Sequence, residues 1–525
     1  MKKILIITLF FGLTTACVND LDVVPVDPNI ETTATLYDDP AVYKQLLAKL
    51  YAGMALTGQQ GPSGNPDIAG IDEGFSSYLR MYWYHQELTT EEAVIGWNDQ
   101  TIKDFHHHTW GAGDLFVQAL YSRIFYQITF ANEFIRETSD GKLSERGISG
   151  AGKADVGLYR SEARFLRALS YWHALDLFGK VPFVTDADPI GAFLPEQSTR
   201  SELFAYIESE LLDMESTMAA PGTNEYARAD QAAAWMLLAK LYLNAEVYTG
   251  QAKYTECITY LNKVIGGGYS LHSNYQGLFL ADNHTSPEVI FPVAFDGANT
   301  QTWGGNTFII HAAVGGNMSP DDFGIDGGWG GTRTTSAFVN KFSDPSGNTD
   351  SRAMFFSDGQ ALEINDIGLF TDGYAITKFK NITSTGTPGA HATFPDTDFP
   401  MFRLADAYLM YAEAVVRGGS GGSVADATGY INALRERAYG NTSGNITETD
   451  LSLDFILDER ARELYWENHR RTDLIRFGKF SQSDYVWPWK GKVKEGISTD
   501  SKLDLFPIPS SDLGANPKLT QNPGY

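Results

Sequence analysis

The sequence predicts a mainly α-helical protein whose helical hairpins form one body, interrupted by an irregular insert with short strands. Apolar residues recur at helical spacing on both sides of the region 269–400. Within that region the stretch 304–331 contains nine glycines, a density that regular elements do not tolerate. Hydrophobic residues make up 43% of the 525-residue chain and charged residues 20%, which is typical of an ordered globular protein.

The N-terminal segment predicts export and lipid anchoring. Two lysines precede an apolar run over residues 4–13, which is too short to span a bilayer and is typical of a signal peptide over residues 1–16. Small residues then lead to Cys17 in a pattern that resembles the site where bacterial lipoproteins are cleaved and acylated. We therefore expect Cys17 to anchor the protein in the outer membrane, and Asp20 and Asp22 resemble a signal for exposure on the cell exterior. An ordinary secretory signal is the alternative.

The segment 17–38 is polar and rich in turn-forming residues, so we expect it to form the lipidated cysteine and a tether. The second cysteine of the chain, Cys257, lies on an apolar helical face. It is therefore expected to be buried and unreactive, without an intrachain disulfide.

The scaffold is predicted to begin with helices over residues 39–268. Thr199 and Glu202 have the spacing of a capping box, and Leu203, Ile207 and Leu211 follow on one stripe. Helical periodicity is found over residues 41–56, 115–136, 160–178, 199–218, 228–248 and 252–265. Small residues on neighbouring segments would allow close packing as tetratricopeptide-like hairpins, although the spacing is irregular and unrelated amphipathic helices are the alternative.

After three consecutive glycines at 266–268 the composition changes, and residues 269–400 are predicted to form a looped, ligand-binding insert. Short β-like runs occur at 289–295 and 307–314. Helical periodicity returns at 401–417, 424–438 and 453–468, so residues 401–525 are predicted to complete the scaffold and end in an irregular tail.

The charge of the chain argues against a nucleic-acid partner. There are 40 Lys and Arg residues against 65 Asp and Glu residues, a net charge of −25, and no basic run. Affinity for phosphate backbones depends on clustered Lys and Arg, so we expect no nucleic acid to bind. Aromatic residues make up 13% of the chain, and we expect some of them to face a ligand.

Several separate phrases resemble the RagB/SusD family of surface glycan-binding lipoproteins. They follow the family's order along nearly the whole chain: Arg164–Phe183, Phe402–Ala414, Glu459–Gly478, and Leu505–Ser510 with Gln521–Gly524. The resemblance implies tetratricopeptide-like units that carry a variable glycan-binding insert and dock on a SusC-type TonB-dependent transporter. The stretches 61–100 and 391–398 are most similar to starch-binding members. The expected ligand is therefore starch or another α-1,4-glucan, with a different glycan as the alternative.

Three tryptophans are candidates for an aromatic sugar platform. Proteins bind sugars by placing flat rings under the apolar faces and polar side chains at the hydroxyl edges. Trp97, Trp303 and Trp329 are flanked by glycines or short polar residues, whereas Trp172 and Trp235 lie on helical stripes typical of a core. The family resemblance implies an aromatic arc at the first three positions, with polar contacts from Arg80, Asp72 and Gln100.

Other chemistry is less well supported by the sequence. Adjacent acids such as Glu91 and Glu92 could suggest a glycosidase, but we expect them to form solvated faces. The consecutive histidines at 106–108 lack the spacing of a helical metal-binding pair, and we expect neither a metal nor a cofactor. A non-catalytic glycan-binding lipoprotein is the leading hypothesis. A surface glycoside hydrolase and a helical scaffold that binds only protein are the alternatives.

Overall fold

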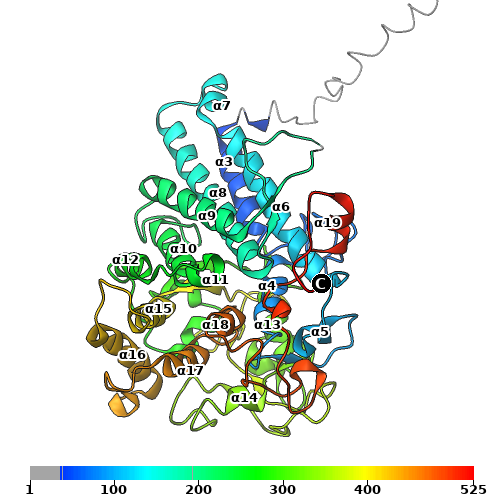
Figure 1. Ribbon diagram of the computed structural model, residues 1–525, viewed down its shortest axis with the longest axis vertical. Coiled ribbons are helices and arrows are strands. Elements are labelled where there is room, and N and C mark those ends of the chain that lie inside the picture. Colours follow the sequence, from blue (N-terminus) through cyan, green and yellow to red (C-terminus); the bar gives the residue numbers. More distant parts are fainter. Residues whose placement is uncertain (1–35, 38, 192) are drawn as a thin grey trace, which may run out of the picture.

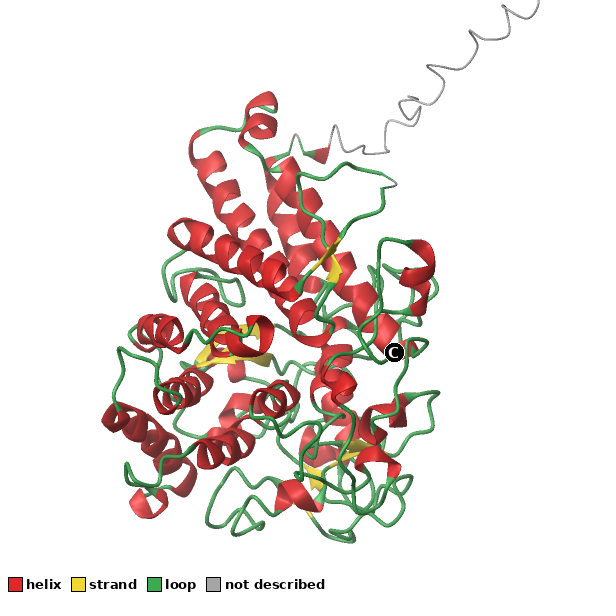
Figure 2. Ribbon diagram, viewed as in Figure 1, coloured by secondary structure: helices red, strands yellow, loops and turns green. Residues whose placement is uncertain are grey.

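The computed structural model describes residues 36–525 except 38 and 192. The predicted signal peptide and Cys17 lie outside the described residues. The described chain is mainly helical with small antiparallel strand pairs, which confirms the predicted fold class. Figure 1 shows the helices stacked from α3, α6 and α8 at the top to α15–α18 below, and Figure 2 shows long loops gathered around α13 and α14 at the lower right.

The first helices pack as antiparallel hairpins. Helix α6 packs against α8, and α8 also packs against α3 and α9. The predicted capping box is present, because Thr199 accepts from the Glu202 amide and the Glu202 side chain accepts from the Thr199 amide. The bounds are α3 Pro40–Ala52, α5 Ile102–His107, α6 Leu115–Glu137, α7 Asp140–Glu145, α8 Gly150–Leu177 and α9 Arg200–Met214.

The hairpins continue across the insert. Helix α10 packs against α12, and α12 packs against α15, which follows the insert in the sequence. The helices before and after the insert therefore form one body. Their bounds are α10 Gln231–Leu243, α11 Ala245–Thr249, α12 Tyr254–Ile265, α15 Leu404–Val416, α16 Val424–Tyr439, α17 Leu453–Leu464, α18 Arg470–Arg476 and α19 Ser510–Ala515.

Several predicted helices differ from the structure in their bounds: α8 begins ten residues before the predicted 160, and α3 and α9 each end four residues before the predicted 56 and 218. The segment 228–248 forms two helices that meet at Asn244. The segment 401–417 begins as strand β8 (Phe399–Arg403), and its helix starts only at Leu404. The segment 453–468 ends as a helix at Leu464, because Trp466 and Asn468 have positive φ angles of 64° and 67°.

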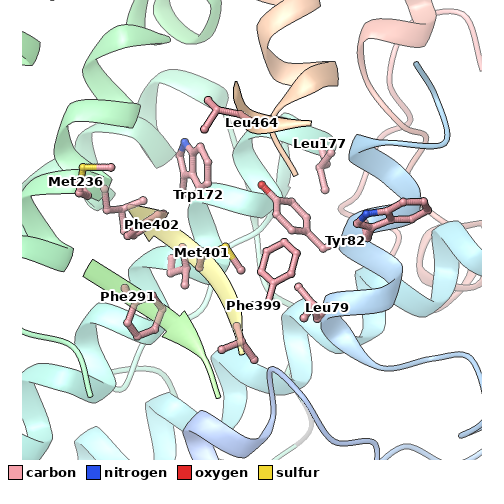
Figure 3. Packing of buried hydrophobic residues seen from close by; sticks show 14 of the residues in the cluster. Leu79, Tyr82, Trp172, Leu177, Met236, Phe291, Phe399, Met401, Phe402 and Leu464 are labelled. Atoms are coloured by element: carbon pink, nitrogen blue, oxygen red, sulfur yellow. The ribbon is translucent and has the colours of Figure 1, made fainter. Parts of the chain in front are cut away.

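Helix α4 (Tyr78–Gln86) lies at the centre of the core and was not predicted. All nine of its residues are buried. Figure 3 shows Leu79 and Tyr82 of this helix close to Phe399, with Leu177 and Trp172 beyond. A helix that is buried on every side has no polar face, so its sequence lacks the stripe from which helices are predicted.

The insert contributes short strand pairs and two α-helices, α13 and α14. Strand β4 (Val289–Val293) pairs with β8, β6 (Phe355–Phe356) with β7 (Ala375–Ile376), and β2 (Val181–Pro182) with β3 (Gln197–Ser198) outside the insert. The run 307–314, predicted to be β-like, instead lies in helix α13 (Gly305–Ala313), and the prediction was wrong. Every residue of α13 is buried, so the apolar run shows no period that separates helix from strand. Helix α14 spans Ser336–Val339.

Several charged side chains that the sequence placed on the surface are buried. Glu91 and Glu92 are fully buried, so the expectation of a solvated face was wrong. Arg470 donates to Glu91 at 2.8 Å, and Tyr485 donates to the same carboxylate at 2.6 Å. Burial of Glu91 is therefore compensated by charge and hydrogen bonds.

A buried charge cluster joins α17 to the insert. Arg403 donates to Glu467 at 2.6 Å, to Glu463 at 2.7 Å and to Glu288 at 2.8 Å. Burial alone would raise the pKa of Glu463, but the neighbouring guanidinium groups lower it to about 2. Seven members of the cluster are buried, namely Glu288, Arg352, Lys378, Arg403, Glu459, Glu463 and Glu467, and the eighth, Arg437, has a side chain that is 4% exposed.

Cys257 is a free, fully buried thiol on α12, as predicted. The described helices include none that is long and apolar enough to cross a membrane. His106 contacts the carbonyl oxygens of Ala93 and Pro488 at 3.1 and 2.9 Å. Within the described part of the chain, no group of three or more His, Cys, Asp or Glu side chains could hold a metal ion.

Candidate functional site

A cavity of about 470 Å3 opens where α4, the loop after β1 (Val94–Ile95) and the start of α6 meet the insert. Five of the six residues predicted to bind sugar line it: Asp72, Arg80, Trp97, Gln100 and Trp329. Trp303 does not line the cavity, but its ring centre lies 6.3 Å from that of Trp329. The structure therefore brings all six residues into one neighbourhood. Whether they bind sugar stays a prediction.

The rings form a row in which Trp329 is central. Its centre lies 6.3 Å from that of Trp97, with 45° between the planes, and the angle to Trp303 is 54°. Phe394 extends the row, 5.2 Å from Trp303. We call Trp97, Trp329, Trp303 and Phe394 the aromatic row. Because successive planes are tilted, the row is not flat, and Phe394 at its end is buried.

Trp329 is positioned by the end of helix α13. The amide of Trp329 donates to the carbonyl of His311 at 2.8 Å, and the amide of Gly331 donates to that of Ala312 at 2.8 Å. These hydrogen bonds use carbonyls that the end of a helix leaves free. The Trp329 ring also stacks on the His311 ring, with centres 4.7 Å apart and 24° between the planes. The central ring thus rests on a buried element of the fold.

Trp97 is positioned by pairing between two distant segments. Strand β1 pairs with β5 (Thr332–Arg333), and the Gly96 amide donates to the Gly331 carbonyl at 2.9 Å. The Trp97 indole N–H donates to the Trp329 carbonyl at 3.2 Å. A Cβ atom on Gly331 would lie 2.6 Å from the Trp97 ring, so this close approach requires glycine.

Arg80 joins three parts of the site from the first turn of α4. Its Nη1 donates to the carbonyls of Gly74 and Trp303 at 2.9 and 3.0 Å, and its Nε donates to the Tyr84 hydroxyl at 3.0 Å. The guanidinium also lies over the Phe308 ring at 4.4 Å and near the Trp97 ring at 5.9 Å. Arg80 therefore holds the loop that carries Trp303.

The remaining polar residues lie at the rim. Asp72 and Gln100 are exposed, and so is Asp99, which the sequence analysis did not select. Asp72 accepts a hydrogen bond from the Gly74 amide at 2.7 Å, which orders its turn. Gln100 has a positive φ of 38°, an uncommon conformation for a residue other than glycine. Exposed polar groups beside apolar rings match the edges and faces of a sugar.

Sequence reasoning missed the residues that support the row. His311 and Phe308 belong to the run that was predicted to be β-like, and Phe394 lies in the segment 391–398, which was noted only for its resemblance. The signal for Phe394 was present, since it stands in an irregular stretch like the three tryptophans. No sequence signal linked His311 to Trp329, because their stacking depends on how the loop after α13 returns.

Comparison with known proteins identifies the family of this chain. The model of the SusD family matches residues 343–525. The starch-binding protein SusD of Bacteroides thetaiotaomicron is 37% identical to this chain, and the alignment covers 99% of this chain and 98% of the relative. This chain belongs to the SusD family. A SusD-like protein, P25, of Formosa agariphila is 25% identical to this family member over 76% of this chain and 78% of its own length.

Solved structures share the fold of this SusD-family protein. A SusD superfamily protein from Bacteroides thetaiotaomicron has a TM-score of 0.71 at 20% identity, over 92% of this chain and 99% of the neighbour. Surface glycan-binding protein A from the same organism, in complex with laminarihexaose, has a TM-score of 0.68 at 18% identity, over 91% of this chain and 98% of the neighbour. A laminarin-binding SusD-like protein has a TM-score of 0.69 at 22% identity, over 92% and 99%. At these identities the likeness shows the fold alone.

Proposed function

We propose that this SusD-family protein binds starch or other α-1,4-glucans without catalysis, on the aromatic row and its polar rim. The observation that carries the proposal is the tilted row of Trp97, Trp329 and Trp303 beside the cavity. A tilted row of rings suits the bend of an α-1,4-glucan, because a ligand that already has the matching shape loses less conformational freedom on binding.

The choice of glycan is supported by the relative that is described as a starch-binding protein and is 37% identical over nearly the whole chain. The two neighbours described with laminarihexaose or laminarin are only 18% and 22% identical, so they support another glycan less strongly. A glycan of the laminarin type is the second candidate. The acids at the rim, Asp72 and Asp99, are exposed to solvent, whereas a glycosidase usually buries its general acid.

The cellular role is the second part of the proposal. We infer that acyl chains on Cys17 anchor the protein in the outer membrane, facing the cell exterior, and that it delivers glycan to a SusC-type TonB-dependent transporter. The broad helical surface is available for such a partner, while the insert supplies most of the aromatic row. The proposal therefore assigns transporter binding to the scaffold, residues 39–268 and 401–525, and glycan binding to the insert, residues 269–400.

Calorimetry with maltoheptaose tests the proposal. Trp329→Ala removes the central ring and should cost about 2 kcal/mol of binding free energy, which is about 25-fold in affinity. Trp235→Ala is the matched control, since Trp235 is a half-buried tryptophan on α10 whose indole donates to Glu215 at 2.8 Å. The control should bind normally.

Two further results decide the glycan. Wild-type protein should bind maltoheptaose more tightly than laminarihexaose or straight cello-oligosaccharides of similar length. Tighter binding of laminarihexaose would replace the glucan assignment with the second candidate. Unchanged maltoheptaose affinity in Trp329→Ala, with a normal circular dichroism spectrum, would show that the row is not the binding site.

A further inference from the structure

A second cavity lies on the C-terminal helices. Its volume is about 420 Å3, close to that of the first, and the two cavities share no lining residue. Its walls come from α16, α17 and the segment 341–350. Figure 1 shows α16 and α17 at the lower left, whereas α5, whose Ile102 lines the first cavity, lies at the right. The second cavity is therefore a separate feature of the surface.

Aromatic rings and guanidinium groups are paired in this cavity. The guanidinium carbon of Arg435 lies 5.0 Å from the centre of the Tyr439 ring and 5.5 Å from that of Phe455. Arg462 lies 5.9 Å from the same Phe455 ring. Both rings are half-buried, so each keeps part of its surface exposed. Rings of this kind beside planar polar groups can cover the apolar face of a sugar and bind its edge.

The charges around the cavity balance. Lys341, Arg435 and Arg462 are matched by three aspartates in the wall, Asp350, Asp454 and Asp458. Behind the wall, the fully buried carboxylate of Glu459 accepts from Arg435 at 2.6 Å and from Arg462 at 2.7 Å, and its charge is balanced by the buried Arg352 at 2.7 Å. A site for an anion would keep an excess of positive charge, which this cavity lacks. The balance favours a neutral ligand.

Unused hydrogen-bonding groups of both kinds lie at the rim. Asp454 is exposed, and its carboxylate makes no hydrogen bond or ion pair with any residue that the structure describes. The Tyr439 hydroxyl accepts from Arg435 at 3.3 Å, and in the described chain its own hydrogen has no acceptor. Sugar hydroxyls both donate and accept, so they can use an acceptor such as Asp454 and a donor such as Tyr439 together.

We propose that this second cavity binds a neutral segment of the same glucan polymer, so that one polysaccharide chain contacts the protein at two sites. The proposal rests on the proposed function, because it takes its ligand from the aromatic row. Two linked sites raise the affinity for a long polymer through effective concentration, without strengthening the binding of a short oligosaccharide at the first site. The second cavity should therefore raise the affinity for starch more than the affinity for maltoheptaose.

The test compares polymer and oligosaccharide in the double variant Asp454→Ala, Tyr439→Ala. Its affinity for amylopectin, measured by retardation in native gels that contain the polymer, should fall roughly tenfold or more. Its calorimetric affinity for maltoheptaose at the aromatic row should stay within about twofold of wild type, since the row is intact. Glu448→Ala, which removes an exposed acid that does not line the cavity, should change neither value.

A conservative variant keeps the test valid if the double alanine variant unfolds. Asp454→Asn with Tyr439→Phe retains both shapes and removes the charge and the hydroxyl, and it should still weaken amylopectin binding. Normal amylopectin retardation in both folded variants would overturn the second site. Loss of maltoheptaose binding in these variants would show that the second cavity and the aromatic row are not independent sites. A normal result for Trp329→Ala would instead contradict the proposed function, so the two failures are distinguishable.

Discussion

The rings of the aromatic row are half-buried for the most part and held by loops, whereas Glu459 and Glu463 of α17 are fully buried and are each held by three arginines. Trp97 makes one side-chain hydrogen bond, at 3.2 Å, to a backbone carbonyl. Glu463 instead lies within ion-pair distance of Arg352, Arg403 and Arg437. Truncating a ring removes surface that a ligand could use, while truncating a member of the charge cluster leaves charges buried without partners. The first change should affect binding and the second should affect folding.

The largest effect is expected from Arg403→Ala. The change leaves the buried carboxylates of Glu288, Glu463 and Glu467 without their shared guanidinium, which should lower the free energy of unfolding by about 3–5 kcal/mol. Urea denaturation measures this loss. Lys44→Ala is the control, because Lys44 and Glu225 form a surface pair whose side chains are 51% and 59% exposed. It should cost less than about 1 kcal/mol. Equal losses in both variants would contradict the contrast.

Burial also explains which helices could be predicted from the sequence. Helices with one apolar stripe, such as α9 and its capping box, were predicted because the local pattern already determines them. Helices α4 and α13 were missed because every residue in each is buried, so no polar face marks the period. Burial of Glu91 was also missed, since its partner Arg470 lies far along the chain.

The candidate site was predicted by residue type but not by arrangement. Glycine-flanked tryptophans indicated an exposed platform from local context alone. The order Trp97, Trp329, Trp303 depends on the pairing of β1 with β5 and on the carbonyls at the end of α13, which are tertiary contacts. The role of Arg80 as a support for the Trp303 loop depends on tertiary contacts in the same way.

Gly331→Ala should produce the next largest effect, and it acts on the row itself. The added Cβ would lie 2.6 Å from the Trp97 ring, so the ring or the strand pair must shift. Partial loss of one ring should cost about 1.4 kcal/mol of glucan binding, or about tenfold. Gly327→Ala is the matched control, since its Cβ would meet no atom within 4 Å. Calorimetry with maltoheptaose separates the two, and equal affinity in both would show that Trp97 tolerates displacement.

The smallest effect concerns pH and the junction between the two regions. Glu87 caps the end of α4, and Glu92 lies just before β1. Burial raises the pKa of Glu87 to about 7 and raises that of Glu92 well above its usual range, where the charge of Glu87 adds to the effect. These acids therefore differ from Glu463, whose arginine partners lower its pKa to about 2.

The direction of the pH dependence follows from these shifts. A raised pKa means that the folded protein favours the protonated acid, so the stabilisation is complete below the unfolded value of 4.5 and is lost as the pH rises through about 7. Each proton released contributes a slope of about 1.4 kcal/mol per pH unit at most. Urea denaturation between pH 5 and pH 8 should show stability falling with pH in the wild type and falling less in Glu92→Gln. Glu448→Gln, an exposed control, should keep the wild-type slope. Identical slopes in all three proteins would mean that Glu87 and Glu92 ionise in the folded protein without loss of stability. These two acids would then resemble the solvated rim of the aromatic row more than the buried charge cluster.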